Sequence, residues 1–71
     1  MDAKQLKFKE LAEKRVNNAI KNIQLIGNLS NTRNYTYSDE DIRKIFKRLK
    51  EEIGISEAKF KSKGKDKDFK L

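Results

Sequence analysis

The side chains of this chain whose type and spacing suit binding chemistry are mostly cations. Lys7, Lys14 and Lys21 recur every seven residues, which places them on one side of a helix. Lysine and arginine neutralise phosphates and release condensed counterions, so cations in this arrangement are typical of nucleic-acid binding. Together with cations of a second predicted helix and two loop residues, they make up the candidate nucleic-acid contacts: Lys7, Lys14, Lys21, Arg33, Tyr35, Arg43, Lys47 and Lys50.

The second group of cations, Arg43, Lys47 and Lys50, is named the basic stripe. We expect it on one side of a helix, opposite the apolar residues of that helix. Like charges four residues apart mildly destabilise a helix, so such a stripe favours an acidic partner. A competing interpretation is an ordinary solvated face. Glutamates four residues away from Lys44 and from Lys47 are placed to pair with these cations.

The polar loop over residues 27–38 supplies Arg33 and Tyr35. Amide, guanidinium and aromatic groups suit phosphate contacts and base stacking. The same residue types also serve ordinary turn chemistry, in which Asn, Ser and Thr bond nearby amides. Both interpretations of this loop stay open at the level of sequence.

The chain lacks the side chains that most often carry catalysis. The chain has no His and no Cys, so we expect no disulfide, no thiolate or imidazole metal site and no cofactor. The one dense carboxylate group, Asp39-Glu40-Asp41, is explained by the positive end of a helix dipole. We therefore predict that the protein is not an enzyme and binds no metal.

Two amphipathic stretches surround the loop, and they predict an all-α fold. The first helix is expected over residues 3–26, and Gly27 stands where a left-handed C-cap residue is wanted. The second is expected over about residues 39–61, with Ser38 as N-cap, Asp41 completing a capping box, and Tyr37 and Ile42 as a hydrophobic staple. The expected core residues are Leu11, Val16, Ile20, Ile23, Ile26, Ile42, Ile45, Phe46, Leu49 and Ile53.

Gly54 raises an alternative for the second helix. A glycine inside a helix is unfavourable, so the helix could break there and restart at Ser56. The first choice is a continuous helix to about Lys61, because Phe60 stays in phase with Ile53. Residues 62–71 alternate Lys with small or acidic residues and are predicted to be a disordered basic tail.

Length and composition predict self-association. The chain has 71 residues, of which 35% are hydrophobic and 41% charged, so one hairpin alone buries little apolar surface. We expect an antiparallel two-helix hairpin that forms a homodimer as a four-helix bundle. Lys4, Lys7 and Lys9 interrupt the N-terminal segment, and the longest apolar run is Leu25-Ile26, so we expect a cytoplasmic protein with no membrane partner.

The net charge of +7 is concentrated at the two ends of the chain. Residues 1–26 contribute +3, residues 27–58 balance to zero, and residues 59–71 contribute +4. Such a distribution suits a polyanion. The sequence therefore favours a small nucleic-acid-binding accessory or regulatory factor, with DNA or RNA as partner. The alternative is a protein–protein interaction module whose hairpin docks onto a helical partner protein.

Overall fold

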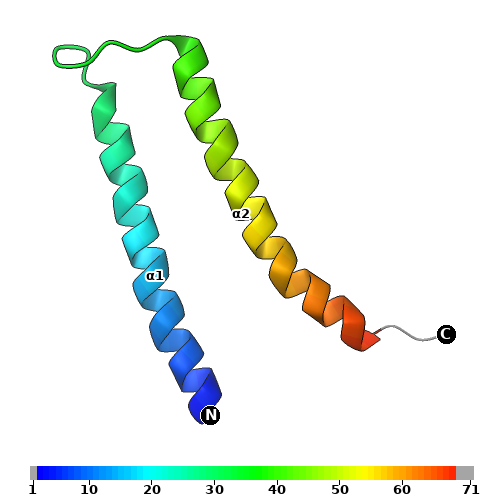
Figure 1. The fold of residues 1–71 in the computed structure, drawn as a ribbon. Coiled ribbons are helices and arrows are strands. Elements are labelled where there is room, and N and C mark those ends of the chain that lie inside the picture. Colours follow the sequence, from blue (N-terminus) through cyan, green and yellow to red (C-terminus); the bar gives the residue numbers. More distant parts are fainter. Residues whose placement is uncertain (1, 69–71) are drawn as a thin grey trace. The chain divides into compact units, whose positions relative to one another are not determined.

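The protein is all-helical over the residues that its structure describes. The structure, a computed structural model, describes the backbone of residues 2–68 and the side chains of residues 2–61. Its elements are α1 (Ala3–Gly27), a short 3₁₀ helix η1 (Asn28–Ser30) and α2 (Asp39–Asp68), with no strand among the described residues (Figure 1). The chain divides into two compact units, residues 1–36 and residues 37–71, so each unit consists essentially of one helix.

The first unit begins with a capping box that our sequence patterns missed. The Gln5 backbone N–H donates to Asp2 Oδ1 at 2.8 Å, and the Asp2 backbone N–H donates to Gln5 Oε1 at 3.2 Å. These two bonds satisfy amide groups that have no partner inside the helix. The signal in the sequence is an Asp followed three residues later by a Gln, and it explains why α1 begins at Ala3.

The end of α1 differs from the prediction. Gly27 was expected as a left-handed cap, but it is the last residue of α1 and has ordinary right-handed angles, φ −58° and ψ −32°. The Asn28 backbone N–H still donates to the Gln24 carbonyl, and the chain then tightens into η1. Because a 3₁₀ turn continues the right-handed helix, no left-handed residue is needed. No described residue has a positive φ.

The start of α2 confirms the predicted cap. Ser38 and Asp41 exchange backbone and side-chain hydrogen bonds, and Asp39, Glu40 and Asp41 occupy the first turn. The predicted staple between Tyr37 and Ile42 stays a prediction.

Helix α2 is continuous through Gly54, so the alternative break at this residue is wrong. Backbone hydrogen bonding outweighs the modest helix propensity cost of one glycine. The backbone of α2 is helical to Asp68, beyond the end near Lys61 that the pattern predicts. The side chains of residues 62–71 and the backbone of residues 69–71 lie outside the described residues, and the predicted disorder of this tail stays a prediction.

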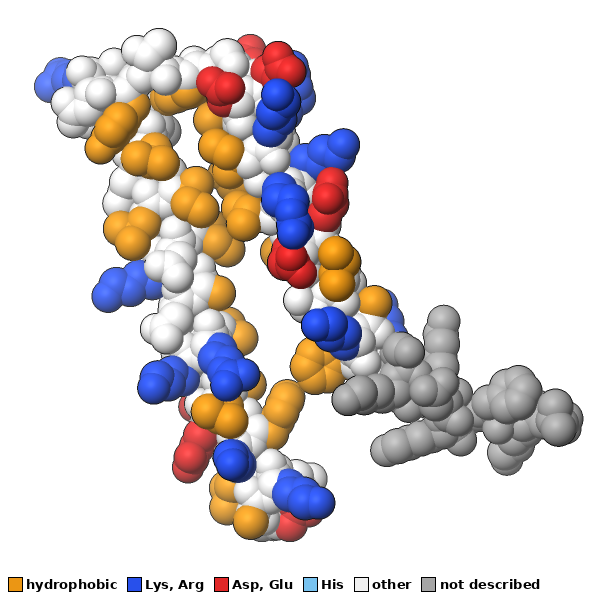
Figure 2. Space-filling model, in the orientation of Figure 1, with side chains coloured by type: hydrophobic (Ala, Val, Ile, Leu, Met, Phe, Trp, Pro, Cys, Tyr) orange, Lys and Arg blue, Asp and Glu red, His pale blue; other side chains and the backbone are white. Residues whose placement is uncertain are grey.

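The apolar residues of each helix are not covered. None of the described residues is buried; Ile26, Ile42 and Leu49 are half-buried, and Ile53 is 60% exposed. Hydrophobic side chains follow both helices in Figure 2. None of the residues expected to form a core is buried among the described residues; each unit is essentially one helix, and a single helix cannot bury its own apolar face.

Candidate nucleic-acid interface

The basic stripe borders the apolar face of α2. At about 100° of rotation per residue, Lys50 lies about 40° and Arg43 about 60° from Phe46 around the helix axis. The prediction placed the stripe opposite Ile42, Ile45 and Leu49, and the centre of the stripe lies about 135° around the axis from the centre of these three residues. The stripe begins one residue after Ile42 and advances by steps of four and three, so it runs along the helix on the Phe46 side of the apolar face.

Ion pairs engage three cations of α2 that lie outside the basic stripe. Three pairs join residues four apart: Glu40–Lys44 at 3.5 Å, Arg48–Glu52 at 2.8 Å and Glu57–Lys61 at 3.7 Å. Arg43, Lys47 and Lys50 take part in no ion pair among the described residues. The charges of the stripe are thus available to an external anion, whereas those of Lys44, Arg48 and Lys61 have an acidic partner.

The expected pairing of Lys47 with Glu51 is not formed. On a helix, an acid that precedes a lysine by four residues is better placed than one that follows it. Both lysine pairs of α2 have the favoured order, and Lys47 has the reverse order. Arg48 also precedes its acid, but its guanidinium offers five donors in a fork that a carboxylate can engage. The prediction of a largely paired face is therefore confirmed for Lys44 and wrong for Lys47.

The stripe is compact and regular. Arg43 and Lys47 are about 6 Å apart along the axis of α2, and Lys47 and Lys50 about 4.5 Å. Figure 2 shows acidic side chains between the basic ones on α2. The three ion pairs of α2 engage Glu40, Glu52 and Glu57 with cations outside the stripe.

A second row of cations lies on α1. Lys7, Lys14 and Lys21 project from the side opposite the apolar face, as predicted, at axial intervals of about 10 Å. No ion pair involves any of the three within the described residues. Glu10 precedes Lys14 in the favoured order, and the two side chains form no ion pair. This row is more widely spaced than the basic stripe.

The loop candidates sit on a turn organised by Asn31. The Arg33 backbone N–H donates to Asn31 Oδ1 at 3.0 Å, and the Tyr35 backbone N–H donates to the Asn31 carbonyl at 3.0 Å. Asn34 donates to the same carbonyl at 3.2 Å. Turn chemistry therefore accounts for Asn31. The bonds of this turn use the backbone N–H groups of Arg33 and Tyr35. The Arg33 side chain is exposed and the Tyr35 residue is 48% exposed, so both remain accessible to a ligand.

The eight candidate residues thus fall into three groups, each on its own element. Arg43, Lys47 and Lys50 share one side of α2, and Lys7, Lys14 and Lys21 share one side of α1. Arg33 and Tyr35 belong to the turn after η1. Of these groups, only the basic stripe is closely spaced and lies on a helix that also carries ion-paired cations.

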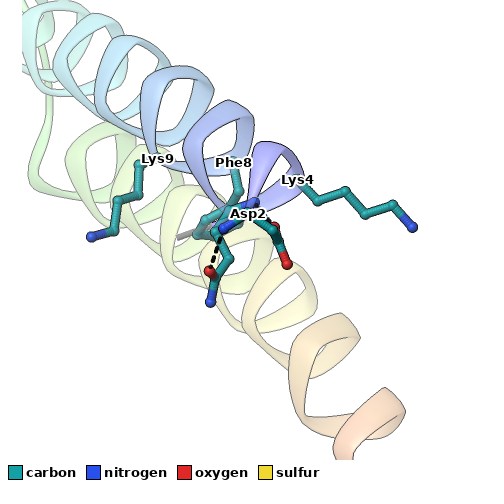
Figure 3. Close-up of a pocket in the computed structure, with 5 residues that line it drawn as sticks. Asp2, Lys4, Phe8 and Lys9 are labelled. Carbon is teal, nitrogen blue, oxygen red and sulfur yellow. Dashed lines mark hydrogen bonds between the residues drawn. The ribbon is translucent and has the colours of Figure 1, made fainter.

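Other kinds of site have little support in the described part of the chain. No group of three or more potential metal ligands occurs there, and no helix among those residues is long and apolar enough to cross a membrane. A hollow beside Asp2, Lys4, Gln5, Phe8 and Lys9 is lined by the first turns of α1 (Figure 3). The dashed line in Figure 3 is the Asp2–Gln5 capping bond, so the polar groups there already serve the helix start.

Comparison with protein-family models, with curated proteins and with solved structures gave no match for this chain. The functional argument therefore depends on its own residues.

Proposed function

We propose that the protein is a non-enzymatic nucleic-acid-binding factor whose main contact surface is the basic stripe of α2. The observation that carries this proposal is that Arg43, Lys47 and Lys50 form a closely spaced row without an ion pair among the described residues, whereas Lys44, Arg48 and Lys61 on the same helix are paired. Lys59 is also unpaired among these residues, but it lies about 150° around the helix axis from the centre of this row. Exposed cations without an internal partner keep their full interaction with phosphate and with the counterions around it.

The row on α1 and the loop would add to the same function. Lys7, Lys14 and Lys21 contribute further exposed positive charge, and Arg33 and Tyr35 add a guanidinium and an aromatic ring. Contacts of this type position a protein on a nucleic acid without reading its sequence. We therefore propose binding that depends on salt and little on base sequence.

We also propose that the working form is a homodimer, in which two antiparallel hairpins pack as a four-helix bundle. The support is that α1 and α2 each have one apolar face and that no described residue is buried. Exposed apolar surface of this extent usually marks an interface. Burying both faces in a bundle would stabilise a chain that is too short to form a large core alone.

The test is fluorescence anisotropy of labelled duplex DNA and single-stranded RNA across a salt series. The test variant carries Arg43→Gln, Lys47→Gln and Lys50→Gln. The control carries Lys44→Gln, Arg48→Gln and Lys61→Gln, which removes the same charge from the paired cations. We expect the first variant to lose most of its affinity and the control to keep most of it. Equal losses would show that total charge, and not the stripe, determines binding.

A second candidate function is a protein–protein module, and the uncovered apolar faces favour it. In that case the apolar face of a helix would dock onto a partner helix, and the charged residues would only keep the surface hydrated. The charge-neutralised stripe variant separates the two functions. It would lose nucleic-acid affinity under the first function and keep its protein partner under the second.

A further inference from the structure

Gly54 lies in line with the basic stripe. At about 100° per residue, its position around α2 is within about 20° of both Arg43 and Lys47. It follows Lys50 by four residues, so it extends the line of the stripe by about 6 Å. Arg43 to Gly54 then makes one continuous row about 16 Å long.

No described residue requires a glycine here. A Cβ atom added to Gly54 would meet no atom within 4 Å among the described residues, and the residue has no positive φ. The position is also about 100° from Ile53 around the axis, so it lies outside the apolar face. A helix-interior glycine costs about 1 kcal/mol relative to alanine, and that cost has no internal compensation.

We propose that Arg43, Lys47, Lys50 and Gly54 form one docking surface for the phosphate backbone of duplex DNA. This inference rests on the proposed function and adds the role of Gly54 and the class of nucleic acid. The three cations neutralise successive phosphates, and the missing side chain lets the sugar–phosphate backbone approach the helix closely. A larger residue at this position would hold the DNA away from the row.

Duplex DNA is the partner that fits a straight helix with cations along one side. A helix is about 10–12 Å across with its side chains, and the major groove of B-form DNA is about 12 Å wide. The major groove of A-form RNA is deep and too narrow for side chains to read. A row of cations on one side of α2 can then follow the phosphates at one edge of the DNA groove, with Gly54 at the point of closest approach.

The experiment measures the affinity of the full chain for a short DNA duplex and for an RNA duplex of the same sequence, by fluorescence anisotropy. The test variant is Gly54→Leu. Its matched control is Gly27→Leu, because Gly27 is also helical, also meets nothing within 4 Å and lies in the other unit. Circular dichroism of each variant reports whether the helices are retained.

We expect Gly54→Leu to keep its helix content and to bind the DNA duplex about tenfold or more weakly, a loss of about 1.4 kcal/mol. Gly27→Leu should bind DNA as the parent chain does, and the parent chain should prefer the DNA duplex to the RNA duplex. Equal affinity of Gly54→Leu and the parent chain would overturn the role of Gly54. Equal affinity for the two duplexes would overturn the choice of DNA.

A third variant separates this inference from the function on which it rests. Neutralising Arg43, Lys47 and Lys50 to glutamine should abolish DNA binding whatever the role of Gly54. If that variant loses binding while Gly54→Leu does not, the proposed function stands and the inference about Gly54 fails. If the neutralised variant binds as well as the parent chain, both fail.

Discussion

Ser38 and Asp41 exchange hydrogen bonds across the first turn of α2. The Asp41 backbone N–H donates to Ser38 Oγ at 3.1 Å, and the Ser38 backbone N–H donates to Asp41 Oδ2 at 3.0 Å. The bond from the Ser38 backbone holds the pKa of Asp41 below its ordinary value of 3.8. The Ser38 hydroxyl and the charge of Lys44 lower this pKa further. The charged form of Asp41 is therefore part of the helix start.

This lowered pKa predicts that α2 weakens in acid. A group whose pKa is lower in the folded state contributes stability that is present above the unfolded-state pKa. That stability is lost as the pH falls from 3.8 through the folded value. We expect helix content, measured by circular dichroism, to decline over this acidic range. Asp41→Asn should flatten that part of the decline, and an unchanged acid transition in the variant would contradict the assignment.

Removing the hydroxyl of Ser38 should weaken the start of α2. Ser38→Ala leaves the Asp41 backbone N–H without its side-chain acceptor, and loss of an N-cap typically costs about 1 kcal/mol. Thermal unfolding should therefore shift to lower temperature. Ser38→Asp keeps an acceptor at this position and should retain most of the stability. If Ser38→Asp lowers the unfolding temperature as much as Ser38→Ala does, the hydroxyl has a role other than capping.

Replacing Gly54 by alanine should stabilise the free protein. The added methyl group meets no described atom, and alanine is favoured over glycine inside a helix by about 1 kcal/mol. We expect a higher unfolding temperature for Gly54→Ala by circular dichroism. Gly27→Ala is the comparison at the end of α1. A destabilised Gly54→Ala variant would show that a neighbouring surface covers this residue in solution.

A charge placed on an apolar face should abolish assembly. Ile23→Asp and Leu49→Asp each put a carboxylate at the proposed dimer core, and a buried charge without a partner costs several kcal/mol. We expect loss of helix content by circular dichroism and of the dimer by analytical ultracentrifugation. Asn18→Asp adds the same charge on the polar side of α1 and should change neither. A folded monomer of either core variant would contradict the bundle.

The salt dependence of binding should report the number of stripe contacts. For duplex DNA, the slope of log affinity against log salt concentration changes by about 0.9 for each phosphate contact. Single substitutions Arg43→Gln, Lys47→Gln and Lys50→Gln should each reduce the steepness by roughly this amount. Lys44→Gln removes a paired cation and should leave the slope nearly unchanged. Equal slopes for all four variants would rule out the stripe as the contact surface.

Much of the fold was predictable because helices are specified by contacts between residues close in the sequence. The period of apolar residues predicted both helices, and Ser38 with Asp41 predicted the start of α2 within one residue. The start of α1 carries the same kind of signal, an N-cap acid at Asp2 followed three residues later by Gln5, and our sequence patterns missed it.

The sequence by itself determined the helical class, the caps and the three groups of candidate cations, because each depends on spacing of a few residues. The three-dimensional structure decided that Gly27 stays right-handed, that α2 passes through Gly54, and that Lys47 leaves Glu51 unpaired. Each of these is a choice between local alternatives of similar energy. Such choices depend on side-chain geometry and on continuous backbone hydrogen bonding, which residue types alone do not specify.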